Sequence, residues 1–223
     1  MIHTKKLNSK EEIRKSKMGG NSLMREANSR IEILKKDLQN GNRIMKNNKD
    51  LSVLAADIRI IAGEYTGNFN VPVFLIAKQL GIGVYKTRFN KNISGRIYAG
   101  GTTKDLYGND AVILISSGDE IGHQRFVVAH EIAHYLLDYL PDKKYKDGKL
   151  FTEDYGMGTH SLEKELRADR FAAELLMPKK LFIEQYNKII NETNDRMFTI
   201  YYLSKYFKTK ISSIEKRIKE VLA

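Results

Sequence analysis

The most constraining feature of the sequence is the segment from about Gly122 to Tyr139, which has no helix breaker after its first residue. As a helix, it would be apolar on nearly every side, and such a helix is buried. Its apolar members are Phe126, Val127, Val128, Ala129, Ile132, Ala133, Leu136 and Leu137. The rest of the chain must therefore cover this helix on all sides. It also carries two histidines and a glutamate, and buried polar groups need partners.

The spacing of these polar residues fits a metal site. Residues four apart lie on one face of a helix, so His130 and His134 present both imidazoles to one point. Glu131 lies next to the first histidine and can reach a water at the metal, which is the basis of the H-E-x-x-H pattern. Only 5 of the 223 residues are histidines, so chance seldom produces this pattern. We predict a zinc site with Glu131 as catalytic base. The alternative is a pair of hydrogen-bonded core histidines.

A catalytic zinc site needs a third protein ligand and one open position. The chain has no cysteine, so the ligand must be His, Asp or Glu. The next predicted helix, residues 161–177, offers two candidate faces. Glu163 lies in a charged row that we assign to solvent, together with Arg167, Arg170 and Glu174. Glu165 lies in an inward-facing row, together with Ala168, Asp169, Ala172 and Leu176.

A metal buried between two helices is reached from the inward face, so we predict Glu165 as the third ligand. Asp169, one turn further along, is placed to accept a hydrogen bond from the second nitrogen of a ligand histidine. The alternative for Asp169 is a local bond to an arginine or to the backbone.

The remaining pattern predicts an α+β fold, mostly helical, with a small three-stranded sheet next to the motif helix. Strand-like runs are expected at residues 82–89, 94–99 and 111–116. Residues 141–159 read as a loop, because they are rich in Lys, Asp and Gly. Further helices are expected at residues 50–62, 72–80, 199–206 and 212–222.

The net charge of +11 is concentrated in the N-terminal part, because residues 1–50 hold 13 Lys and Arg but only 6 Asp and Glu. We predict that residues 1–49 form a basic extension, either flexible or ordered, of a domain spanning residues 50–223. Ile31, Leu34 and Leu38 indicate a weak amphipathic helix within it. A basic segment of this kind favours nucleic acid or an acidic partner, the alternative being a solvated arm.

The N-terminal residues lack the apolar core of a signal peptide, and no stretch approaches the roughly 18 apolar residues of a membrane helix. We therefore expect a cytoplasmic protein without a membrane partner.

Two blocks of the sequence resemble the ImmA/IrrE family of metallopeptidases. The first is RFVVAHEIAHYLL at residues 125–137, and the second is ELRADRFAAELLMP at residues 165–178. The resemblance covers about residues 50–222. It implies a gluzincin arrangement, in which His130, His134 and Glu165 hold zinc. It also implies cleavage of a helix-turn-helix transcriptional repressor, which would derepress a mobile-element, phage or stress regulon.

Residues from about 195 to 223 look like a helix-turn-helix segment found in this family. One interpretation is docking to DNA or to the repressor, and the other is packing of two short helices on the peptidase core. The docking interpretation gives an alternative function, a non-proteolytic regulator that binds a repressor or DNA through its basic arm and C-terminal helices. A peptidase also needs an oxyanion donor. His160 and Tyr155 are candidates, although no spacing argument selects one.

Overall fold

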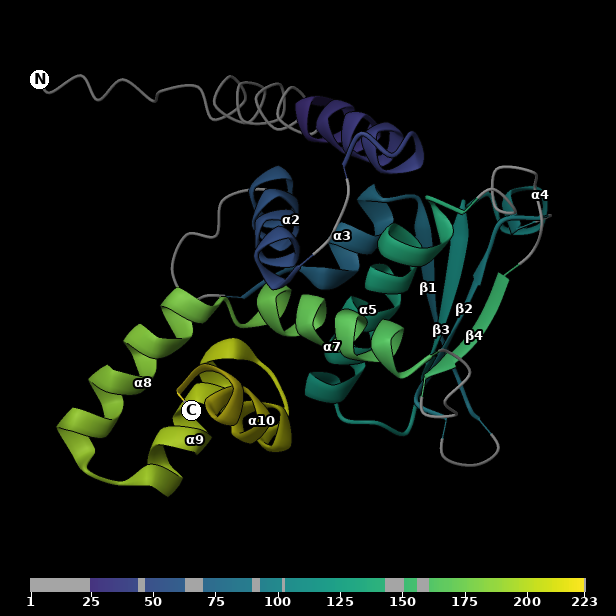
Figure 1. The fold of residues 1–223 in the computed structure, drawn as a ribbon. Coiled ribbons are helices and arrows are strands. Elements are labelled where there is room, and N and C mark those ends of the chain that lie inside the picture. The colour runs from purple at the N-terminus through teal and green to yellow at the C-terminus, as the bar shows by residue number, and fades with distance from the viewer. Residues whose placement is uncertain are drawn as a thin grey trace, which may run out of the picture.

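The computed structural model describes residues 25–43, 47–62, 70–89, 93–101, 103–142, 151–155 and 161–222, with the backbone alone for residues 151–155. Helices cover one face of a mixed β-sheet, and the last three helices extend away from it (Figure 1). No helix within the described ranges is long and apolar enough to cross a membrane.

Within the described ranges, the sheet has four strands in the order β1-β3-β2-β4. β1 (Ile82–Thr87) runs parallel to β3 (Ala111–Ser116), and β2 (Gly95–Ala99) runs antiparallel to β3. These three strands confirm the prediction, as does the α+β class. The loop predicted at residues 141–159 is wrong in part, because β4 (Phe151–Tyr155) lies there and pairs with β2.

The motif helix occupies the centre of the molecule. α5 (Ile121–His134) continues without interruption into the π-helical turn η1 (Tyr135–Tyr139). Every residue from Gln124 to His134 is buried, as predicted, because α5 packs on β2 and β3 on one side and on α7 (Leu162–Leu176) on the other.

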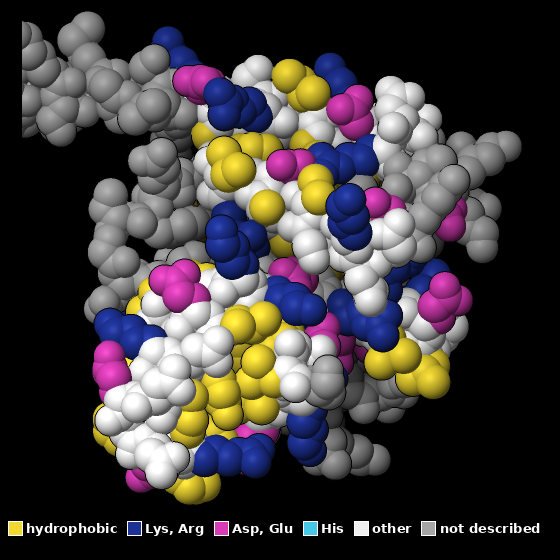
Figure 2. Space-filling view, turned by 60° about the vertical axis from the view of Figure 1, so that its left-hand side comes forward, with side chains coloured by type: hydrophobic (Ala, Val, Ile, Leu, Met, Phe, Trp, Pro, Cys, Tyr) yellow, Lys and Arg dark blue, Asp and Glu magenta, His cyan; other side chains and the backbone are white. Residues whose placement is uncertain are grey.

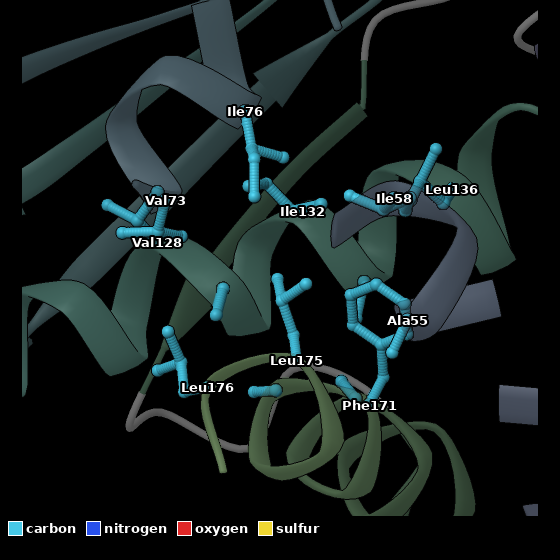
Figure 3. Packing of buried hydrophobic residues seen from close by; sticks show 14 of the residues in the cluster. Ala55, Ile58, Val73, Ile76, Val128, Ile132, Leu136, Phe171, Leu175 and Leu176 are labelled. Atoms are coloured by element: carbon cyan, nitrogen blue, oxygen red, sulfur yellow. The ribbon is translucent and has the colours of Figure 1, made fainter. Parts of the chain in front are cut away.

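Helices from several parts of the chain share one apolar core with the sheet. α2 (Asn48–Ile61) packs on α7, and α3 (Val73–Gln79) packs on α5 and β1, whereas the short α4 (Thr103–Tyr107) lies at β3. Figure 3 shows side chains that meet in this core: Ala55, Ile58, Val73, Ile76, Val128, Ile132, Leu136, Phe171, Leu175 and Leu176. Full burial of one such large side chain contributes about 1.5–3 kcal/mol relative to leaving it exposed.

Local signals set the ends of α7. The Ser161 side chain accepts a hydrogen bond from the Lys164 N–H and so satisfies an otherwise unpaired donor at the helix start. The helix ends shortly before Pro178, as expected for residues that precede a proline. The same proline also begins α8 (Lys179–Thr193), a helix that the sequence analysis missed.

The two predicted C-terminal helices are present as α9 (Arg196–Phe207) and α10 (Ile211–Leu222). A short turn joins them, in which Lys208 adopts the left-handed conformation with φ of 51°. Phe207, Ile214 and Ile218 are buried in the common core, so both helices pack on the rest of the molecule. The lower half of the face in Figure 2, where these helices lie, also exposes a cluster of hydrophobic side chains.

The predicted amphipathic helix near the N-terminus is present as a helix over residues 25–39. Ile31, Leu34 and Leu38 are each at most 5% exposed and belong to the common core. Lys35 forms a salt bridge of 2.7 Å with Asp110, which follows α4. This helix is therefore part of the packed structure, whereas residues 1–24 lie outside the described part. The domain boundary near residue 49 stays a prediction.

Candidate metal centre

Three predicted ligands meet between α5 and α7. The Nε2 atoms of His130 and His134 lie 2.9 Å apart. The Glu165 carboxylate approaches them at 3.3 Å and 3.5 Å, respectively. For zinc bonds of about 2.0–2.1 Å, the edge of a tetrahedron is about 3.3 Å, so these spacings fit one ion. The set therefore has the donors and the spacing of a His, His, Glu metal site.

The helix faces predicted for α7 are partly confirmed. Glu163 is exposed, whereas Glu165 is half-buried and faces the histidines. Ala168 and Ala172 are buried, and such small residues allow α5 and α7 to approach closely. The assignment of the whole charged row to solvent was wrong in part, because Arg167 pairs with Asp138 and Glu174 pairs with Arg217.

Each histidine is held from behind by a carboxylate. His130 Nδ1 lies 3.0 Å from Asp169 Oδ1, the contact expected for Asp169, and His134 Nδ1 lies 2.8 Å from Asp138 Oδ2. A carboxylate at Nδ1 fixes the proton there and leaves the Nε2 lone pair for a metal. The sequence analysis missed Asp138, although its position four residues after His134 was a usable signal.

Both carboxylates carry a cation on their second oxygen. Arg167 of α7 binds Asp138, whose side chain is only 2% exposed. Lys216 of α10 binds Asp169 Oδ2 at 2.6 Å. Two chains of histidine, carboxylate and cation therefore lead away from the predicted ligand atoms.

One protein family matches more than half of the chain. Residues 77–219 match the Peptidase_M78 family model, described as the IrrE N-terminal-like domain. The chain belongs to this family. It therefore contains a metallopeptidase-like domain, and the resemblance to the ImmA/IrrE family is confirmed.

No curated protein matches the chain. Among solved structures, a Mycobacterium tuberculosis transcriptional regulator is similar, with a TM-score of 0.45 and 14% sequence identity. The similarity covers 82% of this chain but only 50% of the regulator.

The carboxylates of this metallopeptidase-like domain control protonation at its histidines. Burial alone would lower the pKa of His130, but hydrogen bonds with Asp169 and Glu165 outweigh burial and raise that pKa above 6.5. The pKa of His134 is raised in the same way, with Asp138 in the place of Asp169. When protonated, both imidazoles donate hydrogen bonds to Glu165, and these hold its pKa far below the ordinary range. The site thus keeps ionised carboxylates beside the histidines, which favours a bound cation.

Glu131 lies where the first residue of β2, Gly95, approaches α5. Its side chain is buried, and the residue is only 1% exposed. A Cβ atom at Gly95 would lie 3.4 Å from Glu131 Oε1 and only 2.3 Å from Val127 Cγ1. Glycine is therefore required at Gly95 for the strand and the helix to approach at the predicted base.

The side chains of both oxyanion candidates lie outside the described part of the chain. His160 lies outside the described residues. The Tyr155 backbone pairs with Gly95 and so lies one strand away from the residue that contacts the Glu131 region. Its side chain is outside the described part, so the role of either residue stays a prediction, as do the roles of the ligands and of Glu131.

Proposed function

We propose that the chain is a zinc-dependent endopeptidase. The observation that carries this proposal is the convergence of His130, His134 and Glu165. Glu131 lies on the same buried helix as the two histidines. Two imidazoles and one carboxylate, without cysteine, form the donor set of catalytic rather than structural zinc sites. Membership of a metallopeptidase-like family supports the same reaction class.

In this proposal, His130, His134 and Glu165 would hold the ion and leave a fourth position open. When bound, zinc lowers the pKa of a coordinated water and polarises the substrate carbonyl. Glu131 takes a proton from the attacking water as the oxygen of that water bonds to the carbonyl carbon. The same carboxyl then gives the proton to the leaving amine as the C–N bond breaks. Asp138 and Asp169 hold the two imidazoles in the required tautomer.

We infer that the substrate is a helix-turn-helix transcriptional repressor. The support is the resemblance to the ImmA/IrrE family, together with the family match over residues 77–219. Cleavage of such a repressor would release its target genes, and this substrate would place the reaction in the cytoplasm.

The proposal is tested with Glu131→Gln, which removes the base but keeps the shape of the side chain. We expect cleavage of a helix-turn-helix protein encoded beside the gene to fall by about 100-fold to 10,000-fold. Zinc content should be unchanged, because Glu131 is not among the ligands. Glu163→Gln is the matched control, since Glu163 is exposed on α7. Mass spectrometry of the products measures cleavage, and wild-type rates in Glu131→Gln would refute the mechanism.

A second candidate function is a non-proteolytic regulator, favoured by one feature of the C-terminal helices. A pocket of about 770 Å³ lies at the turn between α9 and α10, and in its lining Lys205, Lys208 and Lys210 outnumber the acidic residues Glu120 and Glu215. Such a basic surface suits an acidic protein or nucleic acid. In this case Glu131→Gln would still derepress the target gene in cells, whereas charge removal at the three lysines would abolish derepression. Strongly salt-dependent binding of duplex DNA would also favour it.

A further inference from the structure

Asp169 lies between the predicted metal ligand His130 and a residue from the far end of the chain. Its Oδ1 lies 3.0 Å from His130 Nδ1, and its Oδ2 accepts a hydrogen bond of 2.6 Å from Lys216 Nζ. The Asp169 side chain is 22% exposed, so solvent competes for an oxygen that loses its partner. The carboxylate is thus held from two sides, by the motif helix and by α10.

We propose that Lys216 is a positioning residue for His130, acting through Asp169, and that α10 is therefore part of the metal centre. This inference rests on the proposed metal site. It extends that site from the two motif helices to the C-terminal helix pair.

The position of Lys216 is fixed by its neighbour in the sequence. The Arg217 side chain is fully buried. It donates hydrogen bonds of 2.9 Å and 3.1 Å to the Met177 carbonyl and also pairs with Glu174. Met177 and Glu174 lie at the end of α7, so Arg217 anchors α10 to the helix that carries Asp169, and Figure 1 shows α10 beneath α7. The apolar residues Ile214 and Ile218 add buried contacts on the same helix.

Stability alone does not account for the contact between Lys216 and Asp169. The Lys216 side chain is 66% exposed, and ion pairs at such exposure contribute little to folding. Orientation of a metal ligand is more sensitive, because loss of a group that orients a ligand histidine lowers metal affinity by about 10-fold to 100-fold. Lys216 acts one bond further from the metal than Asp169. We therefore expect its effect near the lower end of that range.

A purely electrostatic role for Lys216 makes the opposite prediction. A cation near a metal site repels the ion, so removing its charge would tighten metal binding. Positioning predicts instead that affinity falls when Lys216 is neutralised and returns when another cation of similar reach replaces it. Lys216→Arg is a suitable rescue variant, because the larger guanidinium keeps the charge and has room to fit. Lys216 borders a cavity of about 420 Å³ between α5, α7 and α10.

The experiment measures the zinc dissociation constant of the full chain by competition with a chromophoric chelator. We expect Lys216→Met to bind zinc about tenfold more weakly than wild type, and Lys216→Arg to remain within about twofold. Lys219→Met is the control, because it removes the same charge from an exposed position on the same helix, and it should bind as wild type does. Nitrogen chemical shifts of the metal-free protein should also show a mixed His130 tautomer in Lys216→Met alone.

The inference is overturned if Lys216→Met binds zinc as tightly as Lys219→Met or more tightly, or if Lys216→Arg fails to restore affinity. The proposed function fails in a different way. In that case the wild-type chain itself would not bind zinc, and the inference would fall with it.

Discussion

Replacement of Gly95 by alanine tests the packing that brings β2 to the predicted catalytic base. The new Cβ would lie 2.3 Å from Val127 Cγ1, whereas carbon atoms in contact are about 3.5–4.0 Å apart. The two elements must therefore separate by more than about 1 Å. Neither moves easily, because Val127 is fully buried and β2 is paired with a strand on each side.

Overpacking of this kind costs about 1–3 kcal/mol. For a chain of this size, each kcal/mol lowers Tm by about 2–4 °C, so Gly95→Ala should lower Tm by about 2–12 °C. Urea unfolding followed by circular dichroism measures the free energy directly. Gly118→Ala is the control, because its Cβ would meet only Ser116 Oγ at 3.8 Å. The control should be unchanged or stabilised by up to about 1 kcal/mol. Equal stability of the two variants would refute the close approach of β2 and α5.

Two further predictions concern the imidazoles. Asp138→Asn should weaken zinc binding by about 10-fold to 100-fold in chelator competition, while the exposed Asp105→Asn has no effect; equal affinities would mean that Asp138 does not orient His134. Only neutral imidazoles bind zinc, and the pKa values of His130 and His134 are raised above 6.5. Added zinc should therefore raise Tm most at high pH, and this rise should shrink as the pH falls through those pKa values. Without zinc the sign reverses, since the stability from a raised pKa is present below 6.5 and lost as the pH rises. A zinc-dependent rise in Tm that is constant from about pH 8 to about pH 5 would contradict this.

The central part of this arrangement was predictable because its signals are local. His130 and His134 are one helical turn apart, so their common face follows from helix geometry alone. The choice of Glu165 over Glu163 needed only the separation of apolar and charged faces on one helix. The three predicted strands are short apolar runs bounded by turn residues, and they pair as a sheet.

Other elements were missed for two different reasons. α8 and Asp138 carried usable local signals: a proline at the helix start and a spacing of four from a histidine. β4 carried none that was sufficient, because a polar strand of five residues depends on its partner β2 for its conformation. Pairing between distant segments is set by tertiary packing, which a single sequence does not encode in any short window.

The contact between Lys216 and Asp169 also depends on tertiary packing, because its two residues lie 47 positions apart in the sequence. It also makes the two histidines unequal. The carboxylate behind His134 is held by Arg167, so that chain of contacts lies within α5, η1 and α7. The carboxylate behind His130 depends on α10, which reaches α7 only after the chain has passed through α8 and α9. If the C-terminal helices affect the proposed metal site, the structure therefore favours an effect through His130, with His134 retained by the core.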